Sequence, residues 1–169
     1  NPGDYPPASS VFQQAAQEEQ KGLYNEAREL YYQAKDLDCI RFRASEEINS
    51  IIHELSLEHA IQLVPAKSDY FEKVSPHQLI GDNLMTEHVH PNIDGYFLLA
   101  DAFFHGIAES EIMGEKPDAV LYKNSAYYKR NWGYTELDSL VALHGVNLLK
   151  TNWPFRSIES SSEDYRLNY

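Results

Sequence analysis

The most restrictive stretch of the chain is TEHVHPNIDGYFLLADAFFHGI, residues 86–107, in which a polar loop runs directly into a long apolar segment. From Asp94 to Glu109 the apolar residues fall on most sides of a helix instead of forming one stripe. Such a helix is typical of a protein interior. The stretch therefore predicts a buried helix that anchors the loop in front of it.

The loop combines a carboxylate and imidazoles at a spacing suited to general-base chemistry. A catalytic histidine needs its ring held in one tautomer, usually by a carboxylate on the other ring nitrogen. Glu87 and His90 lie three residues apart, and we predict that they face each other while His88 points away. The candidate catalytic residues are His90 and Glu87. Residues expected to shape or support the loop are His88, Pro91, Asn92 and Gly95.

The N-terminal part predicts a helical hairpin. Residues 1–10 are Pro-rich and polar, as in a linker, and Gly22 separates two runs of helix formers. Within residues 11–38, KGLYNEARELYYQAKDLD resembles the second half of a tetratricopeptide repeat, with Gly22, Tyr24, Ala27, Tyr31, Ala34, Leu37 and Asp38 in register. The resemblance implies a protein partner, while an ordinary helical hairpin explains the same pattern. Because solenoids need about three repeats, a single hairpin is expected to dock elsewhere.

A third helix and a strand are predicted next. RFRASEEINSIIHELSLEHA has an apolar stripe at helical spacing, formed by Ile48, Ile51, Ile52 and Leu55. AIQLVPA then indicates a short buried strand, which makes an α/β half-unit with the helix. A lone strand needs neighbours for its backbone groups. We therefore expect its edges to pair with a second copy of the chain or to be covered by helices.

The block EHVHPNIDGYFLLA resembles the C-terminal block of SGNH (GDSL-like) hydrolases, an acid-x-x-His-Pro loop followed by Gly and an apolar helix. The resemblance spans about residues 22–108, and its specific part is Glu87 to Ala100. It implies that Glu87 and His90 are two members of a Ser-His-Asp triad. It also implies the last helix-strand-loop-helix part of a three-layer α/β domain, which acts on an ester-type small molecule or glycan.

The chain departs from that family in two ways. Glu87 stands where the family usually has Asp. The family's nucleophile lies in a Gly-Asp-Ser block, but Gly81 and Asp82 are followed by Asn83. We therefore expect the nucleophile and the oxyanion hole upstream of these residues. The chain by itself is then expected to lack esterase activity.

Two alternatives remain open at this stage. The chain is a non-catalytic, tetratricopeptide-like interaction module with a degenerate hydrolase-like loop, or the loop binds a metal. In the second case His88 and His90 would be ligands together with Glu87 or Asp82. The leading interpretation, an ester hydrolase, requires no metal and no other cofactor.

Composition, net charge and capping residues set the remaining expectations. A net charge of −12 argues against nucleic acid as a partner, and no apolar stretch reaches membrane-spanning length. One cysteine, Cys39, does not indicate a compartment. TELDSLVALHGVNLLK predicts a last helix opened by Thr135, after an irregular stretch at 111–134. The fold expected is an α/β fragment, mainly helical, divided as 1–38 (linker and hairpin), 39–110 (hydrolase-like part) and 111–169 (helical extension and tail).

Overall fold

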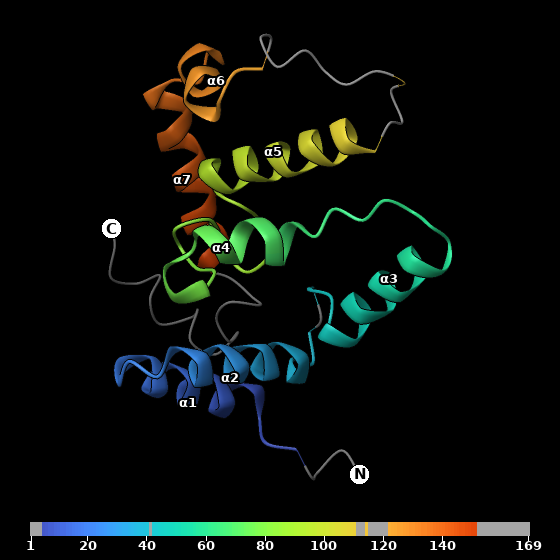
Figure 1. Ribbon diagram of the computed structural model, residues 1–169. Helices are drawn as coiled ribbons and strands as arrows, with labels where there is room; N and C mark the ends of the chain where they lie inside the picture. Colours follow the sequence, from blue (N-terminus) through green and yellow to red (C-terminus); the bar gives the residue numbers. More distant parts are fainter. Residues whose placement is uncertain (1–4, 41, 111–113, 115–121, 152–169) are drawn as a thin grey trace, which may run out of the picture. The chain divides into compact units, whose positions relative to one another are not determined.

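The structure is a computed structural model that describes residues 5–40, 42–110, 114 and 122–151. These residues form seven α-helices and no β-strand (Figure 1). The chain divides into two compact units, Asn1–Tyr122 and Lys123–Tyr169. The expectation of a mainly helical chain is therefore confirmed. None of the helices described is both long and apolar enough to cross a membrane.

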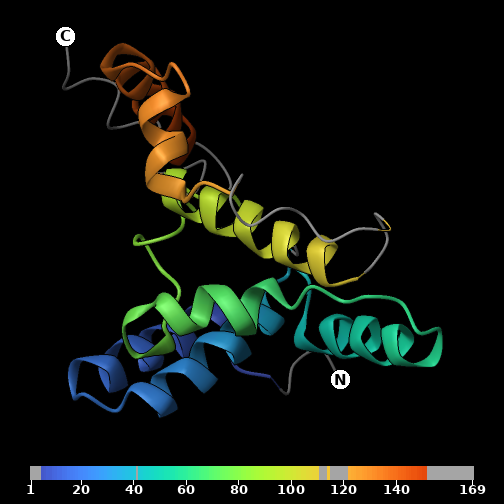
Figure 2. The ribbon, with the colours of Figure 1, turned by 45° about the horizontal axis from the view of Figure 1, so that its top comes forward.

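The N-terminal hairpin forms as predicted. Helix α1, Ala8–Gln20, and helix α2, Tyr24–Leu37, lie side by side (Figures 1 and 2). Gly22 makes the turn between them at φ +79°, a left-handed conformation that favours glycine. Small side chains let the two helices approach closely, and the buried residues between them are Val11, Ala15, Ala27 and Ala34.

The third predicted helix is α3, Glu46–Glu58. It begins where the Ser45 side chain accepts a hydrogen bond from the Ile48 amide, an ordinary N-cap. Its apolar stripe is exposed to solvent in the part of the chain that the structure describes. The exposed side chains are Ile48, Ile51, Ile52 and Leu55. The helix was predicted correctly. Within the described residues, however, no other element packs over its apolar stripe.

The predicted strand at AIQLVPA is wrong for the described residues. Residues 61–65 form no regular secondary structure and no β-ladder. The Ile61 amide donates to Ser56 O, 2.9 Å away, and so ends α3 with Ala60 at φ +50°. Strand pairing requires a neighbouring strand, and none of the described residues provides one. A helix covers part of this segment instead, since Val64 packs against Gly106 so closely that a Cβ on the glycine would lie 2.4 Å from Val64 Cγ2.

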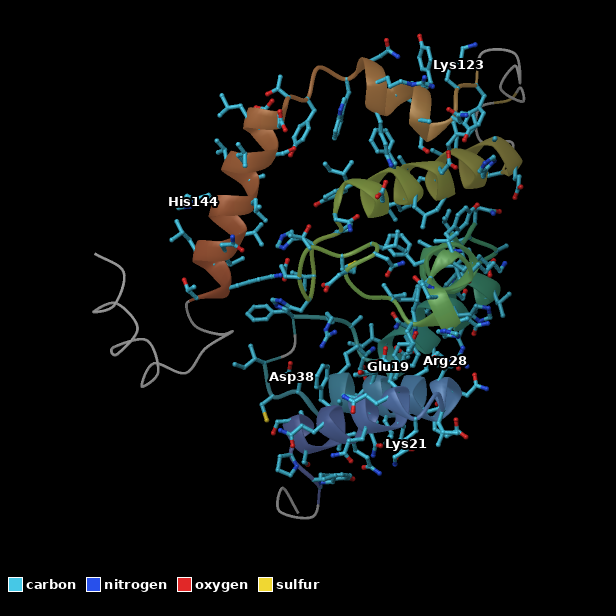
Figure 3. The ribbon with its side chains drawn as sticks, turned by 90° about the vertical axis from the view of Figure 1, so that its left-hand side faces the viewer. Glu19, Lys21, Arg28, Asp38, Lys123 and His144 are labelled. Atoms are coloured by element: carbon cyan, nitrogen blue, oxygen red, sulfur yellow. The ribbon has the colours of Figure 1, made fainter. Side chains whose placement is uncertain are left out.

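Residues 66–78 form short turns that connect to the hairpin through polar groups. They are a π-helical turn, Ala66–Phe71, a short helix α4, Glu72–Val74, and a 3-10 turn, Pro76–Gln78. The ring of His77 stacks on Tyr24 with centroids 3.5 Å apart, and Gln78 accepts a hydrogen bond from Arg28, labelled on α2 in Figure 3.

Glu46 is the centre of a second group of polar contacts with the hairpin. Its carboxylate lies 2.6 Å from Lys35 Nζ and 2.7 Å from Lys67 Nζ. The Lys67 ammonium also lies 3.8 Å from the centroid of the Tyr32 ring, and the Tyr32 hydroxyl donates to Glu72. The hairpin therefore docks on the following segment, as a single hairpin was expected to do, and charged side chains make much of the contact.

Helix α5, Ile93–Glu109, follows the candidate loop. Its small residues face the interior: Gly95, Ala102 and Gly106 are buried. The prediction of a helix apolar on most sides and buried all round was too strong, because several large side chains are half exposed, among them Tyr96, Phe103 and Ile107. The packed face of α5 is thus the one that carries glycine and alanine.

The second unit contains two helices, α6, Ser125–Asn131, and α7, Glu136–Lys150. The capping box at the start of α7 is present: Thr135 and Asp138 satisfy each other's backbone amides. Helix α6 corrects the expectation of an irregular stretch there. Helix α7 is exposed, including His144, labelled in Figure 3. Residues 1–4 of the expected linker and 152–169 of the expected tail lie outside the described residues.

Candidate functional site

The candidate loop is closed at its base by backbone contacts. Met85 and Pro91 form an antiparallel bridge, and the Thr86 amide donates to His90 O at 2.8 Å. The Thr86 hydroxyl also donates to Pro91 O at 3.3 Å. These contacts place residues 87–90 at the tip of a tight loop, so their side chains must share a small space.

Asn92 and Gly95 fix this loop on α5. The Asn92 side chain caps the helix by accepting from the Gly95 amide at 3.0 Å, and its Nδ2 donates to Asp82 O at 3.0 Å. A Cβ on Gly95 would lie 2.2 Å from Leu84 O and 2.9 Å from Pro91 Cβ. Only glycine therefore allows the helix to start this close to the loop, which agrees with the loop-shaping role expected of Pro91, Asn92 and Gly95.

The Glu87 carboxylate is the centre of the loop. Its side chain is only 2% exposed. Oε1 accepts from the His90 amide at 2.9 Å and contacts His90 Nδ1, while Oε2 accepts from the Val89 amide at 3.1 Å. The structure thus brings together the acid and the base that the sequence predicted to face each other.

His90 is held through one ring nitrogen and open at the other. Its side chain is 63% exposed, with Nδ1 on Glu87. Among the described residues, His90 Nε2 has no hydrogen-bond partner. This is the arrangement that a general base requires, since the lone pair on Nε2 is accessible while the carboxylate orients the ring.

The position of His88 corrects the prediction that it points away. Its Nδ1 lies 2.5 Å from Glu87 Oε2, and its side chain is 27% exposed. The ring of Phe42, from the segment before α3, meets the His88 ring edge-to-face with centroids 5.4 Å apart. Alternation of side chains fails here because the Glu87 side chain turns back over its own loop. No spacing in the sequence indicated that Phe42 would reach this site.

The Glu87 carboxylate stays charged despite its burial. Burial by itself raises the pKa of Glu87, but the hydrogen bonds from the His90 ring and from the Val89 and His90 amides, with the charge of His88, outweigh it. The pKa of Glu87 is therefore lowered from its ordinary value. A charged carboxylate is the form that orients an imidazole and stabilises an imidazolium.

The segment before the loop supplies no nucleophile. Asn83, in the position where a Gly-Asp-Ser block would have serine, donates to Ser75 Oγ at 3.0 Å and accepts from the Gly81 amide at 3.1 Å. Ser75 is buried beside it. Within the described residues, no hydroxyl is hydrogen-bonded to His90. Glu87 and His90 are thus paired with each other and, among the described residues, not with a hydroxyl group.

The metal alternative gains no support from the geometry. No group of three or more His, Cys, Asp or Glu side chains is arranged to hold an ion in the part of the chain that the structure describes. The Nδ1 atoms of His88 and His90 are both directed at Glu87 and not at a common point. Comparisons of the chain with protein-family models, with curated proteins and with solved structures give no match.

Proposed function

We propose that this chain is the C-terminal part of an SGNH-like ester hydrolase and supplies the acid and the base of its triad. The observation behind the proposal is the Glu87–His90 pair, in which a buried carboxylate holds Nδ1 and leaves Nε2 accessible. The resemblance of residues 87–100 to the C-terminal block of that family assigns the same two roles. Substrates would be ester-linked acyl groups on a small molecule or glycan.

In the complete enzyme, His90 would act first as a base and then as an acid. Nε2 accepts the proton of a serine hydroxyl as its oxygen attacks the ester carbonyl, and Glu87 stabilises the resulting imidazolium. The tetrahedral intermediate then collapses, the alkoxide leaves with the proton from Nε2, and an acyl-serine remains. Water repeats the sequence through Nε2 and releases the carboxylic acid.

The proposal extends to an α/β domain completed by residues beyond the described part. Residues 61–65 form no regular secondary structure of their own, and the apolar stripe of α3 is uncovered in the described part of the chain. A sheet that accepted this segment would place α3 and α5 as covering helices, because helices flank a parallel sheet in such domains. These features support the proposal without establishing the sheet.

A fluorophosphonate probe, which reacts with activated serines, tests the proposal on a polypeptide that extends this chain upstream. We expect labelling and ester cleavage in the extended polypeptide, and neither in residues 1–169 alone. In the extended polypeptide, kcat should fall by about 10⁶-fold for His90→Ala and about 10⁴-fold for Glu87→Gln. His90-dependent ester turnover by residues 1–169 alone, or an extended polypeptide that never labels, would reject the proposal.

The second candidate is a non-catalytic interaction module that uses the hairpin. It is favoured by the hairpin of α1 and α2, whose segment KGLYNEARELYYQAKDLD resembles the second half of a tetratricopeptide repeat. The same labelling experiment separates the two candidates, since an interaction module gives no labelled serine at any length of chain. A hairpin-dependent protein complex together with an unlabelled extended polypeptide would establish the second candidate.

A further inference from the structure

One carboxylate serves two imidazoles in the candidate loop. Glu87 Oε1 contacts His90 Nδ1, and Glu87 Oε2 lies 2.5 Å from His88 Nδ1. The two backbone amides that complete the set, from Val89 and His90, also divide between the two oxygens. Each oxygen therefore contacts one amide and one imidazole, and of the two imidazole contacts the one with His90 has hydrogen-bond geometry.

The protonation of the two Nδ1 atoms follows from this geometry. Glu87 Oε2 carries negative charge, and an unprotonated ring nitrogen only 2.5 Å away would be repelled strongly. His88 Nδ1 is shielded from solvent, so water cannot intervene, and its contact with Glu87 Oε2 is a close ion-pair contact without hydrogen-bond geometry. Both rings must then carry a proton on Nδ1, and in a neutral ring the lone pair is on Nε2.

The two histidines differ in what they can do next. The His90 side chain is 63% exposed and can meet a substrate, whereas the His88 side chain is 27% exposed and lies against Phe42. Phe42 restrains the His88 ring, and the ring in turn restrains Oε2. If Oε2 is fixed, the plane of the carboxylate is fixed, and Oε1 is directed at His90.

We infer that His88 is a positioning residue: the close contact of its Nδ1 with Glu87 Oε2 fixes the carboxylate, so that Glu87 Oε1 keeps His90 in the Nδ1–H tautomer with Nε2 ready to accept a proton. The catalytic meaning of this role rests on the proposed function. The role itself concerns only the conformation of this loop and can be measured without any enzymatic activity.

Nitrogen-15 NMR of the imidazoles in residues 1–169 tests the inference at a pH where both rings are neutral. In the unaltered chain, we expect His90 to be almost wholly the Nδ1–H tautomer. His88→Phe keeps a ring beside Phe42 but removes the donor, and His90 should shift toward the mixed tautomers of a free imidazole. His88→Asn places an amide N–H near the position of Nδ1 and should restore the Nδ1–H form.

Two further variants separate this positioning role from a non-specific change in the structure of the chain. Glu87→Ala removes the shared acceptor and should release both rings, while His53→Phe, an exposed change on α3, should leave the His90 signals unaltered. Proton–nitrogen amide spectra confirm that each variant is folded. A His90 tautomer that is unchanged in folded His88→Phe would overturn the inference, and so would a His88→Asn variant that behaves like His88→Phe.

The outcome for the proposed function is read separately. In the extended, active polypeptide, His88→Phe should lower kcat about tenfold with little change in KM, and His88→Asn should recover most of the loss. A tautomer shift in residues 1–169 without serine labelling of the extended polypeptide would support the positioning role and reject the hydrolase. Labelling without a tautomer shift would support the hydrolase and reject the positioning role.

Discussion

The backbone of Gly95 lies so close to Leu84 that a Cβ on the glycine would be 2.2 Å from the Leu84 carbonyl oxygen. This contact joins the start of α5 to the base of the loop that holds Glu87 and His90. A carbonyl oxygen belongs to the backbone and cannot rotate away as a side chain would. The fit of the loop on the helix therefore depends on the absence of one methyl group.

Gly95→Ala should lower the free energy of unfolding by about 1–3 kcal/mol, the usual cost of overpacking, and should weaken the Glu87–His90 contact. Chemical denaturation and the His90 imidazole spectrum measure the two effects. Gly81→Ala is the matched control in the same unit, because nothing lies within 4 Å of a Cβ at that position. Equal stability of the two variants would contradict the close contact.

Ala60→Gly should stabilise the first unit. Ala60 has φ +50° at the C-terminal end of α3, a left-handed conformation that costs about 1–2 kcal/mol for a residue with a Cβ. Glycine removes that cost but adds freedom to the unfolded chain, so a net gain of about 0.5–1 kcal/mol is expected. Thermal or chemical unfolding would show it, and a loss of stability would mean that Ala60 is not left-handed in solution.

The contribution of Glu87 to stability should depend on pH in a defined window. Because its folded pKa lies below the ordinary glutamate value of about 4.3, the charged form is favoured by folding. That contribution is fully present above the unfolded pKa and is lost as the pH falls through the lowered folded pKa. Below about pH 5.5, the stability difference between the unaltered chain and Glu87→Gln should shrink as the pH falls. A difference that grows as the pH falls through that acidic range would contradict the direction of the shift.

Glu46→Gln should loosen the attachment of the hairpin. Burial raises the pKa of Glu46, but hydrogen bonds from Lys35 and Lys67 outweigh it and the pKa is lowered, so the charged form makes these contacts. We expect a loss of about 1 kcal/mol that shrinks as salt is added. Glu18→Gln is the control, since its partner Lys21, the C-cap residue of α1, is 59% exposed and that pair should contribute almost nothing. A salt-independent loss would indicate packing and not charge.

The elements that the sequence predicted well are those decided by neighbours in the chain. Gly22 at the hairpin turn and the Thr135–Asp138 capping box both depend on hydrogen bonds and dihedral angles within a few residues. The predicted contact of Glu87 with His90 belongs to the same group, because the two residues share one tight loop. Local chemistry of this kind is readable from the sequence.

The predictions that failed required information from outside the segment. A strand at residues 61–65 depends on a partner strand, and the Val64–Gly106 contact depends on a helix forty residues away in the chain. Alternation suggested that His88 would point away from Glu87, but the carboxylate turns back to meet it, and the His88 ring also meets Phe42 edge-to-face. Neither contact leaves a periodic signal in the sequence.

The polar attachment of the hairpin has a consequence for how the chain can change over evolutionary time. The hairpin keeps its own alanine-lined core, and the contacts of Arg28, Tyr32 and Lys35 with the following segment are made by groups that water can replace. A module joined in this way can be gained, lost or exchanged through a few surface substitutions. The neighbouring loop can then keep its chemistry while the appended helices acquire a new one.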